Sequence, residues 1–400
     1  MRRATSTTNI GPLHGTTVVE FGNLIAGPYA AMLLADLGAR VIKVEPPSGD
    51  LARQFGPFIN GESALFMAVN RGKESLAIDT KDWVSKRVLD NLVRKADVLI
   101  HNLRQGAMER LGLGYERATE MNPGLIYATV TAFGAEGPYA KRTGIDVIFQ
   151  GESGMISITG EPRDGARKTA TTIGDYVAGT NTALAVSAAL AERARTARRI
   201  DVSLRDGLLA VQSGWNAIGL ATGTQPDRTG TASPFLAPNR VFEAADGPFT
   251  LAIVSDRHFE LLADALERSD LLEDFPTNEL RMANRASLER KLGRLFRQEP
   301  LDHWVQLFEA AGLPVGRVLT LEEALNDPQA RHNEMLIEVE HPVAGKVKTT
   351  GSPIRVDGSA ARAEMVPATL GQHTTALLGE LGLDDETIST MIEKGTAVAS

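Results

Sequence analysis

One carboxylate, Asp175, stands at the start of a long alanine-rich pattern, in the stretch "TTIGDYVAGT". Apolar residues recur at helical spacing over residues 176–195, so a helix is predicted to begin here. A short acidic side chain at this place can be the helix N-cap, because it accepts a hydrogen bond from an unpaired N–H of the first turn. The same donors and the helix dipole can also keep the carboxylate ionised, ready to act as a nucleophile. Asp175 is therefore either a cap or a nucleophile.

A second group of chemically useful residues follows two predicted strands, residues 75–79 and 97–101. In an open α/β sheet, ligands bind at the carboxyl ends of the strands. Basic or amide donors there favour an anionic, nucleotide-like ligand, with a solvated surface as the alternative. These donors are Thr80, Lys81, Asn102, Arg104 and Arg110. Arg71 and Lys73, just before the first of the two strands, are expected at the solvated surface.

Several common kinds of catalytic site have no support in the sequence. The first strand–helix turn, "FGNLIAGP", lacks the G-x-G-x-x-G spacing of nicotinamide dehydrogenases. There is no Walker loop, no G-x-S-x-G elbow and no H-E-x-x-H motif. The seven histidines are scattered and cysteine is absent, so no metal site is predicted and covalent catalysis must use oxygen or nitrogen.

The elements that must position these residues alternate between short β-branched runs and longer helical patterns, which is typical of a parallel sheet with crossover helices. The fold class predicted is α/β, with a large doubly wound, Rossmann-like parallel sheet and a smaller α+β domain. Strands are predicted at residues 17–21, 40–45, 75–79, 97–103, 124–133 and 198–204. Helices are predicted at residues 27–38, 84–96, 106–112, 176–195 and 206–222, the last capped by Asp206.

Four hundred residues exceed the size of a single growing core, so more than one domain is expected. Residues 11–222 are predicted as the α/β domain and residues 223–240, rich in Gly, Pro, Ser and Thr, as a linker. Residues 241–327 read as the small α+β domain, with a hairpin turning at Asp246 and Gly247 and helices at 258–267, 285–297 and 301–311. Residues 328–400 are expected to pack back onto the first domain.

Composition and charge limit the partners. With 43% hydrophobic and 23% charged residues the chain resembles an ordinary globular protein. Its net charge of −8 argues against nucleic acid or an anionic membrane as the main partner. The basic N-terminus, residues 1–17, has no apolar core of signal-peptide length and reads as a flexible arm, and no segment is long and apolar enough to span a membrane. A cytoplasmic protein is expected.

The motifs in order resemble those of one family. The series "FGNLIAGPYAAMLLADLGARVIKVEPPSGD", "NRGKESLAID", "ADVLIHNLRQGAMERLGLGY", "FQGESGMISITGEP" and "GDYVAGTNTALAVSAAL" is similar to the family III CoA-transferases, which include formyl-CoA transferase and α-methylacyl-CoA racemase. The resemblance runs in register over residues 11–206 and more loosely beyond. In that family the catalytic aspartate sits in a G-D step at the start of a helix. The resemblance thus implies that Asp175 is a nucleophile that forms a mixed anhydride.

The resemblance also implies where CoA binds, whether a cofactor is permanently bound and how the chains associate. Asp146 and Gln150 would lie near the reacting carboxylate, and for Asp146 a structural cap or ion pair stays an equal alternative. The implied CoA-binding residues are Leu24, Ile25, Ile78, Thr80, Lys81, Asn102, Arg104, Ala107 and Arg110. CoA or acyl-CoA would be a substrate, with no permanently bound cofactor and no metal. Family members form interlocked dimers, so a homodimer acting on an acyl-CoA and a carboxylic acid is expected.

Two departures from the family narrow the activity. Racemase members carry a histidine where this chain has Ile145, and isoleucine cannot transfer a proton, which argues against a racemase. The glycine-rich loop of formyl-CoA transferases is replaced by "TASPFLAPNRVFEAADG", which argues against formyl-CoA or oxalate. The prediction is a CoA-transferase, with a 2-methylacyl-CoA racemase or isomerase as the alternative and a non-catalytic CoA-binding protein as a third class. Arg240 is either a ligand for a distal substrate carboxylate or a surface residue.

Overall fold

The computed structural model describes residues 11–162, 165–192, 196–360 and 366–400. Residues 1–10 of the predicted arm and 193–195 of a predicted helix lie outside this part. The chain divides into two compact units, the first comprising Met1–Ser153, Ala170–Gln212 and Leu325–Ser400 and the second Gly154–Thr169 and Ser213–Ala324. The four-segment division made from the sequence stays a prediction.

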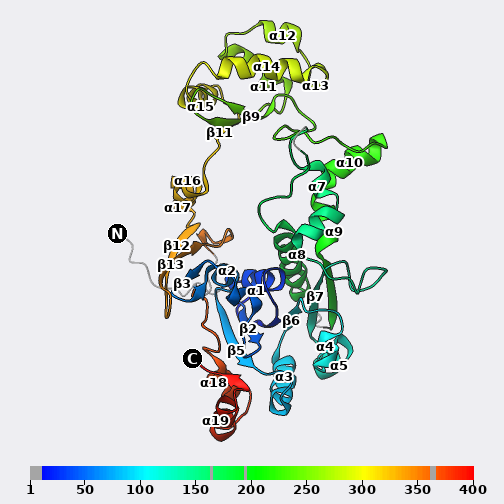
Figure 1. Ribbon diagram of the computed structural model, residues 1–400, viewed down its shortest axis with the longest axis vertical. Coiled ribbons are helices and arrows are strands. Elements are labelled where there is room, and N and C mark those ends of the chain that lie inside the picture. The colour runs from blue at the N-terminus through cyan, green and yellow to red at the C-terminus, as the bar shows by residue number, and fades with distance from the viewer. Residues whose placement is uncertain (1–10, 163–164, 193–195, 361–365) are drawn as a thin grey trace. The chain divides into compact units, whose positions relative to one another are not determined.

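The first unit is built on a seven-stranded sheet in the order β16-β5-β2-β1-β6-β7-β8 (Figure 1). Its strands are β1 (Thr17–Phe21), β2 (Arg40–Glu45), β5 (Lys73–Ile78), β6 (Val98–His101), β7 (Ile126–Thr131), β8 (Arg198–Ser203) and β16 (Ala397–Val398). All pairs are parallel except β16 with β5. Along the chain, β2 and β5 are added on one side of β1, and β6, β7 and β8 on the other. The predicted α/β class with a large, mostly parallel sheet is confirmed, and the antiparallel edge strand β16 was not foreseen.

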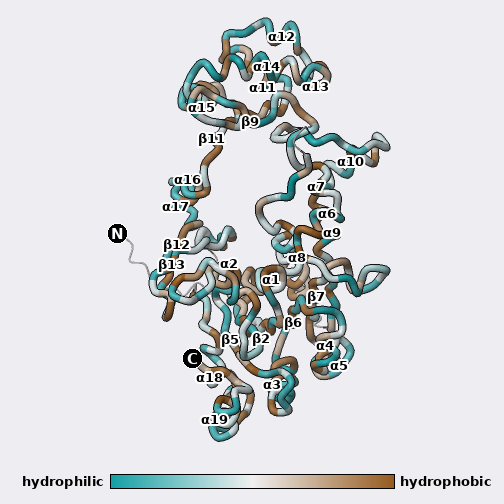
Figure 2. The backbone as a smooth tube through the Cα atoms, in the orientation of Figure 1, coloured by the Kyte–Doolittle hydropathy of each residue, from teal (hydrophilic) through white to brown (hydrophobic). Residues whose placement is uncertain are grey.

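Each face of this sheet has its own apolar cluster, because successive strand residues point to opposite faces. One cluster joins Val19, Ile42 and Leu76 to helices α3 (Trp83–Lys95), α18 (Thr374–Glu380) and α19 (Asp385–Glu393). The other joins Val18 and Val41 to α1 (Ala26–Asp36) and α8 (Ile173–Leu190). Figure 2 shows the hydrophobic residues gathered along α1 and the strands of this sheet. Helices thus cover both faces.

The α1 side of the sheet also carries buried charge. Glu20 and Lys43 are register partners on β1 and β2, and both are buried. Lys73 is the first residue of β5 and is buried as well, and the buried Arg71 pairs with Asp36 at the end of α1. The expectation that Arg71 and Lys73 lie at the solvated surface is wrong, because each finds acidic partners inside the unit.

The remaining elements of the first unit are short. They are η1 (Leu51–Gln54), β3 (Phe58–Ile59), β4 (Glu62–Ser63), α2 (Ala64–Val69), α4 (Ala107–Arg110), α5 (Tyr115–Met121), α6 (Asp146–Glu152), α9 (Leu204–Val211), α17 (Pro328–His332), the hairpin β12 (Leu336–His341) with β13 (Gly345–Thr350), and β14 (Arg355–Val356) with β15 (Ser359–Ala360). The single helix predicted at 206–222 is two, α9 and α10 (Ser213–Thr222). Its cap is Ser203, which accepts from the Asp206 N–H, so the prediction of Asp206 as the cap is wrong.

The second unit contains the predicted hairpin. β9 (Asn239–Glu243) pairs antiparallel with β10 (Pro248–Ala252), and β11 (Val315–Arg317) completes the sheet. A phenylalanine-rich core packs β9 and β10 against α11, α14 and α15. The helices are α7 (Met155–Ile158), α10, α11 (Asp256–Ala265), α12 (Asp270–Asp274), α13 (Asn278–Ala283), α14 (Arg285–Phe296), α15 (Leu301–Ala310) and α16 (Leu321–Asn326). The helices predicted near 258, 285 and 301 are confirmed to within two residues at each end.

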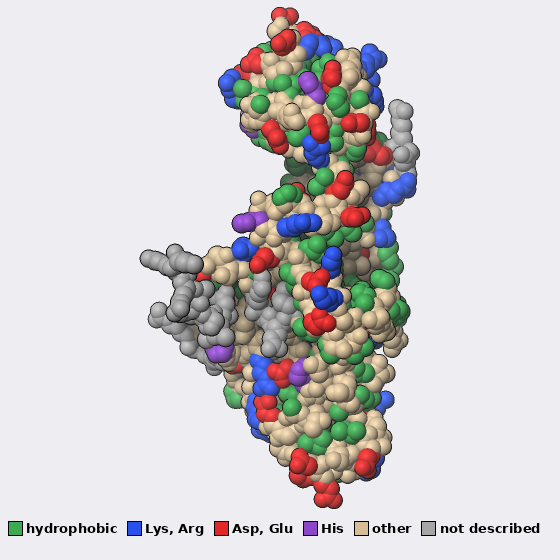
Figure 3. Space-filling view, turned by 90° about the vertical axis from the view of Figure 1, so that its left-hand side faces the viewer, with side chains coloured by type: hydrophobic (Ala, Val, Ile, Leu, Met, Phe, Trp, Pro, Cys, Tyr) green, Lys and Arg blue, Asp and Glu red, His purple; other side chains and the backbone are tan. Residues whose placement is uncertain are grey.

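No helix within the described residues is long and apolar enough to cross a membrane. On the face shown in Figure 3, acidic and basic side chains are interspersed rather than gathered by sign.

Candidate active site

The first turn of α8 places Asp175. The N-cap residue of α8 is Thr172, so Asp175 is the third residue of the helix and not its cap. Of the two readings of Asp175, that of N-cap of its own helix is therefore wrong, and that of nucleophile stays a prediction. The sequence could not fix the helix start, because small and apolar residues precede Asp175 as well as follow it.

The Asp175 carboxylate instead lies at the start of a different helix. The N–H of Ala26, the first residue of α1, and the Asp175 N–H act on this carboxylate and lower its pKa. The N-cap residue of α1, Ile25, makes no side-chain cap bond, so the N–H groups of the first turn of α1 favour a nearby negative charge. The two helices come this close because α8 carries Gly179, where an added Cβ would lie 2.9 Å from the Ala26 carbonyl oxygen and from Cδ1 of Tyr29.

Asp146, the first residue of α6, in turn caps α8. Its Oδ1 accepts from the Gly174 N–H at 2.8 Å, and its Oδ2 accepts from Nε2 of Gln150 at 2.6 Å. A Cβ at position 174 would lie 3.0 Å from that Oδ1, so glycine permits the approach. Asp146 and Gln150 are buried. The structural role of Asp146 as a cap is thus real, and it places a second carboxylate beside Asp175.

Burial and this second carboxylate decide the charge state of Asp175. Loss of solvent, followed by repulsion from Asp146, raises the pKa of Asp175 to about 7, although the N–H groups of Ala26 and Asp175 act in the opposite direction. The two opposing causes outweigh the helix donors that were expected to keep this carboxylate ionised, so its pKa lies near neutral pH.

The loop that leads into α1, residues 22–25 and here called the first loop, is held by its neighbours. Asn102, which follows β6, accepts from the Asn23 N–H and donates to the Asn23 carbonyl oxygen, both at 2.8 Å. Leu24 has a positive φ of 63°, and its N–H donates to Asp50 Oδ1 at 3.0 Å. Three predicted residues, Leu24, Ile25 and Asn102, therefore lie together next to Ala26 and Asp175.

The other predicted donors are spread along the same edge of the sheet. Thr80 is half-buried and Lys81 exposed after β5, which β2 and β1 separate from β6, a span of roughly 14 Å at the usual strand spacing. The Ile78 side chain is fully buried in the apolar cluster and meets no solvent. The donors after the two predicted strands thus form two groups rather than one cluster.

Around α4 the donors face solvent. Arg104 and Arg110 are exposed, and Ala107, the first residue of α4, is half-buried. Within the described ranges neither arginine has an acidic group within ion-pairing distance, unlike the exposed Arg117, Arg142 and Arg198. An end of Arg110 passes over Gly106, where an added Cβ would lie 3.1 Å from Nη1.

Comparison with known proteins identifies the family of this chain. The sequence pattern of CoA-transferase family III matches residues 13–374. The chain belongs to this family. It is 39% identical over 355 residues to acetyl-CoA:oxalate CoA-transferase of Acetobacter aceti, covering 87% of this chain and 90% of that one. It is 33% identical to human succinyl-CoA:glutarate CoA-transferase, covering 97% and 90%.

Solved structures agree. A CaiB/BaiF family protein from Brucella suis has a TM-score of 0.81 and 34% identity, covering 93% of this chain and 99% of that one. A protein from Mycobacterium tuberculosis has a TM-score of 0.82 and 32% identity, covering 92% and 99%. This family III enzyme is therefore a CoA-transferase that moves CoA between an acyl-CoA and a carboxylic acid.

A buried charged group behind the first loop, formed by Glu20, Lys43, Asp50 and Lys73, was not predicted from the sequence. A signal was present, since charged residues interrupt strand runs that are otherwise apolar, as in "TVVEF" and "RVIKVE". A charge buried in a strand must be paired, so such positions indicate partners on neighbouring strands. Which partners these are depends on strand order, which the sequence does not state.

The transferase has no cluster of three or more His, Asp or Glu side chains suited to a metal ion among its described residues. CoA thioesters are the substrate class of CoA-transferases.

Proposed function

We propose that Asp175 is the nucleophile of this transferase. Its carboxylate attacks the acyl carbon of the donor thioester, the C–S bond breaks, and CoA leaves as the thiolate while a mixed anhydride forms. The acceptor carboxylate then attacks the acyl carbon of Asp175, the bond from that carbon to the donor carboxylate breaks, and the donor acid leaves while a second mixed anhydride forms. Attack of the thiolate on the acceptor's acyl carbon forms the new thioester and returns the Asp175 carboxylate.

The observation that carries this proposal is the half-buried Asp175 carboxylate near the N-terminus of α1. A carboxylate with a pKa of about 7 is more basic than an ordinary aspartate and hence a better nucleophile once ionised, and near neutral pH a large fraction is ionised. The Ala26 N–H favours its ionised form. Asp146 and Gln150 act as support by fixing the start of α8, through the bond to the Gly174 N–H.

The CoA site is proposed at the edge formed by the first loop, β5, β6 and α4. Exposed guanidinium groups at Arg104 and Arg110 are suited to phosphates, because charge-assisted bonds to phosphate are strong. The remaining members proposed are Leu24, Ile25, Ile78, Thr80, Lys81, Asn102 and Ala107. The roughly 14 Å between the two donor groups suits an extended ligand such as CoA, with adenine near Thr80 and Lys81 and the phosphates near Asn102 and α4. Ile78 would contribute through its main chain.

The acceptor is proposed to be a short dicarboxylic acid. Two relatives, each matched over 90% of its own length, are named for oxalate and for glutarate. The absence of the glycine-rich loop therefore does not exclude oxalate. Arg240 is not proposed as the ligand of the distal carboxylate, since its Nη1 lies 2.6 Å from Glu289 Oε2.

A homodimer in the cytoplasm stays part of the proposal. α10 has no buried residue although it is largely apolar, and Leu220 within it is 86% exposed. Leu184 on α8 is 68% exposed. Apolar helix surfaces of this kind are typical of chains that associate. Light scattering that gives the mass of one chain, 42.9 kDa, would contradict the dimer.

The nucleophile is tested by mass spectrometry of the intact protein after mixing with acetyl-, succinyl- and oxalyl-CoA. The unaltered chain is expected to gain one acyl group, mapped to the peptide that contains Asp175. Asp175→Asn keeps the shape and a hydrogen-bond acceptor but should gain none and transfer no CoA. An adduct elsewhere, or transfer by the variant, would contradict the proposal.

A further inference from the structure

The backbone of the first loop is bonded to side chains from three other segments of the first unit. The Asn102 side chain accepts a hydrogen bond from the Asn23 N–H and donates one to the Asn23 carbonyl oxygen. Asp50 Oδ1 accepts a hydrogen bond from the Leu24 N–H. The Asp50 carboxylate has two further donors beside it: the Ala52 N–H lies 2.8 Å from Oδ1 and Lys43 Nζ lies 2.7 Å from Oδ2. Asp50 therefore joins the loop to the charged interior of the sheet.

Two buried lysines bind backbone carbonyl oxygens of the first loop and of the first turn of α1. Lys43 Nζ donates to the Gly22 carbonyl oxygen at 2.8 Å, and Lys73 Nζ donates to the Pro28 carbonyl oxygen, in the first turn of α1, at 2.7 Å. Glu20 bridges them, with Oε1 2.9 Å from Lys43 and Oε2 2.8 Å from Lys73. Each ammonium group thus has an acidic partner and a backbone carbonyl oxygen on the path into α1.

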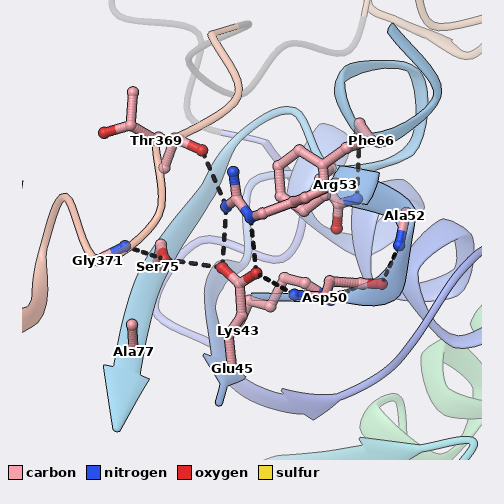
Figure 4. A network of polar contacts seen from close by, with 12 residues as sticks. Lys43, Glu45, Asp50, Ala52, Arg53, Phe66, Ser75, Ala77, Thr369 and Gly371 are labelled. Atoms are coloured by element: carbon pink, nitrogen blue, oxygen red, sulfur yellow. Dashed lines mark hydrogen bonds and ion pairs between the residues drawn. The ribbon is translucent and has the colours of Figure 1, made fainter. Parts of the chain in front are cut away.

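The charges in this interior are paired. Glu45 accepts from the Asp50 N–H at 3.0 Å, and its carboxylate also pairs with Arg53, whose guanidinium lies over the Phe66 ring (Figure 4). Three cations, Lys43, Lys73 and Arg53, face the carboxylates of Glu20, Glu45 and Asp50, and Glu62 Oε2 lies 3.9 Å from Arg53 Nη1. The two lysines hold the pKa of Glu20 below its usual range despite full burial, whereas burial lowers the pKa of Lys73 to about 8, so Lys73 loses its charge above that pH.

The loop needs such support because Leu24 has a φ of 63°, a conformation that leucine rarely adopts without external contacts. Two residues further on, the Ala26 N–H lowers the pKa of Asp175, and the Ala26 carbonyl oxygen lies against Gly179 of α8, 2.9 Å from where a Cβ would stand. A change in the conformation of Leu24 would therefore move the donor that favours the ionised form of Asp175.

We propose that Glu20, Lys43, Asp50 and Lys73 form a clamp that positions the first loop, and through the Ala26 N–H the Asp175 carboxylate, for acyl transfer. They are positioning residues, since none of them touches Asp175. A buried ionic group is weak evidence for stability, because well-packed apolar side chains would serve stability as well. Its bonds to the backbone of one loop and the adjacent turn are what a positioning role requires. The inference rests on the proposed role of Asp175.

The test compares two matched variants, Asp50→Asn and Asp36→Asn. Both carboxylates are buried and are surrounded by donors, so an amide at either position turns an N–H toward another donor. Asp50 bonds to the first loop, whereas Asp36 lies at the far end of α1 and bonds to Arg71. The other titratable groups that act on or near Asp175, namely Asp146, Tyr29 and Tyr176, are the same in both variants.

The readout is the single-turnover rate of acyl-adduct formation at Asp175 with saturating donor thioester, measured from pH 5 to 9. In Asp50→Asn the midpoint of the rise in rate with pH is expected to move up by about one unit, because the ionised form loses a positioned donor. In Asp36→Asn the midpoint should stay at that of the unaltered chain even where the melting temperature falls. Equal midpoints in all three proteins, or equal shifts in both variants, would overturn the clamp.

A second variant covers the case in which Asp50→Asn does not fold. Asn102→Ala removes both bonds to Asn23 and leaves no buried charge unpaired, and the midpoint should again rise. An unchanged midpoint in this variant would also overturn the inference. If the unaltered chain forms no adduct at Asp175, the proposed nucleophile itself is wrong, and the clamp falls with it.

Discussion

Removing the Asp175 carboxyl should stabilise the protein in alkaline solution while abolishing transfer. The folded chain holds the Asp175 proton with a pKa of about 7, against 3.8 for an ordinary aspartate. Each pKa unit corresponds to 1.36 kcal/mol, so ionising this group inside the fold costs up to about 4 kcal/mol. Since Asp175 is partly exposed and the site can relax, a net gain on the order of 2 to 4 kcal/mol is expected for Asp175→Asn.

The effect has a defined pH range. Because the folded chain binds this proton more tightly than the unfolded chain, the stability is unaffected below about pH 4 and falls as the pH rises from 4 to 7. Above pH 7 the loss is complete. The asparagine variant has no such proton, so the difference in melting temperature between the two proteins should be small at pH 4, grow up to pH 7 and then stay constant.

Melting curves of both proteins at pH 4 to 9, measured without CoA, check this expectation. Asp206→Asn, which removes an exposed carboxyl from the first turn of α9, serves as the control and should show no pH-dependent difference. A difference between Asp175→Asn and the unaltered chain that is constant from pH 4 to 9, or that grows as the pH falls, would show that Asp175 is not held protonated by burial and by Asp146.

Three further outcomes follow from the same structure. Arg110→Ala should weaken CoA binding by about 1.5 to 3 kcal/mol in calorimetry if the guanidinium holds a phosphate, and Arg110→Lys should restore only part of this; equal affinities would place the phosphates elsewhere. With a chiral 2-methylacyl-CoA in heavy water, the α-proton followed by NMR should stay unexchanged, because the isoleucine at position 145 cannot transfer a proton. An added dicarboxylic acid should become a CoA thioester in the same mixture. Rapid deuteration at the α-carbon would instead favour an isomerase. Gly179→Ala should lower the stability by about 1 to 3 kcal/mol in thermal unfolding, because its Cβ would lie 2.9 Å from the Ala26 carbonyl oxygen; an unchanged melting temperature would mean that α1 and α8 can separate without cost.

Much of the fold could be read from local pattern. The strands β1, β2 and β8 and the helices α1, α3, α14 and α15 lie where the sequence predicts them, because their apolar periodicity is long or their boundaries carry Pro, Gly or a capping residue. The two-residue strand β16 was missed, since a strand that short has no period of its own and exists only by pairing with β5. The break between α9 and α10 was missed because both halves share one apolar texture.

The sequence by itself determined the kinds of chemistry that this protein can use. Because cysteine is absent, any covalent catalysis had to use an oxygen or nitrogen nucleophile, and no metal-ligand spacing predicted a metal site. The ordered motifs around Asp175 indicated a CoA-transferase. The environment of Asp175 was decided only by tertiary structure. The N–H group that lowers its pKa belongs to Ala26, about 150 residues earlier in the chain. The carboxylate that raises its pKa by repulsion, Asp146, lies on another helix. Burial and charge act through space, so a carboxylate that reads as an ionised cap along the chain becomes one with a pKa near 7 when the helices pack.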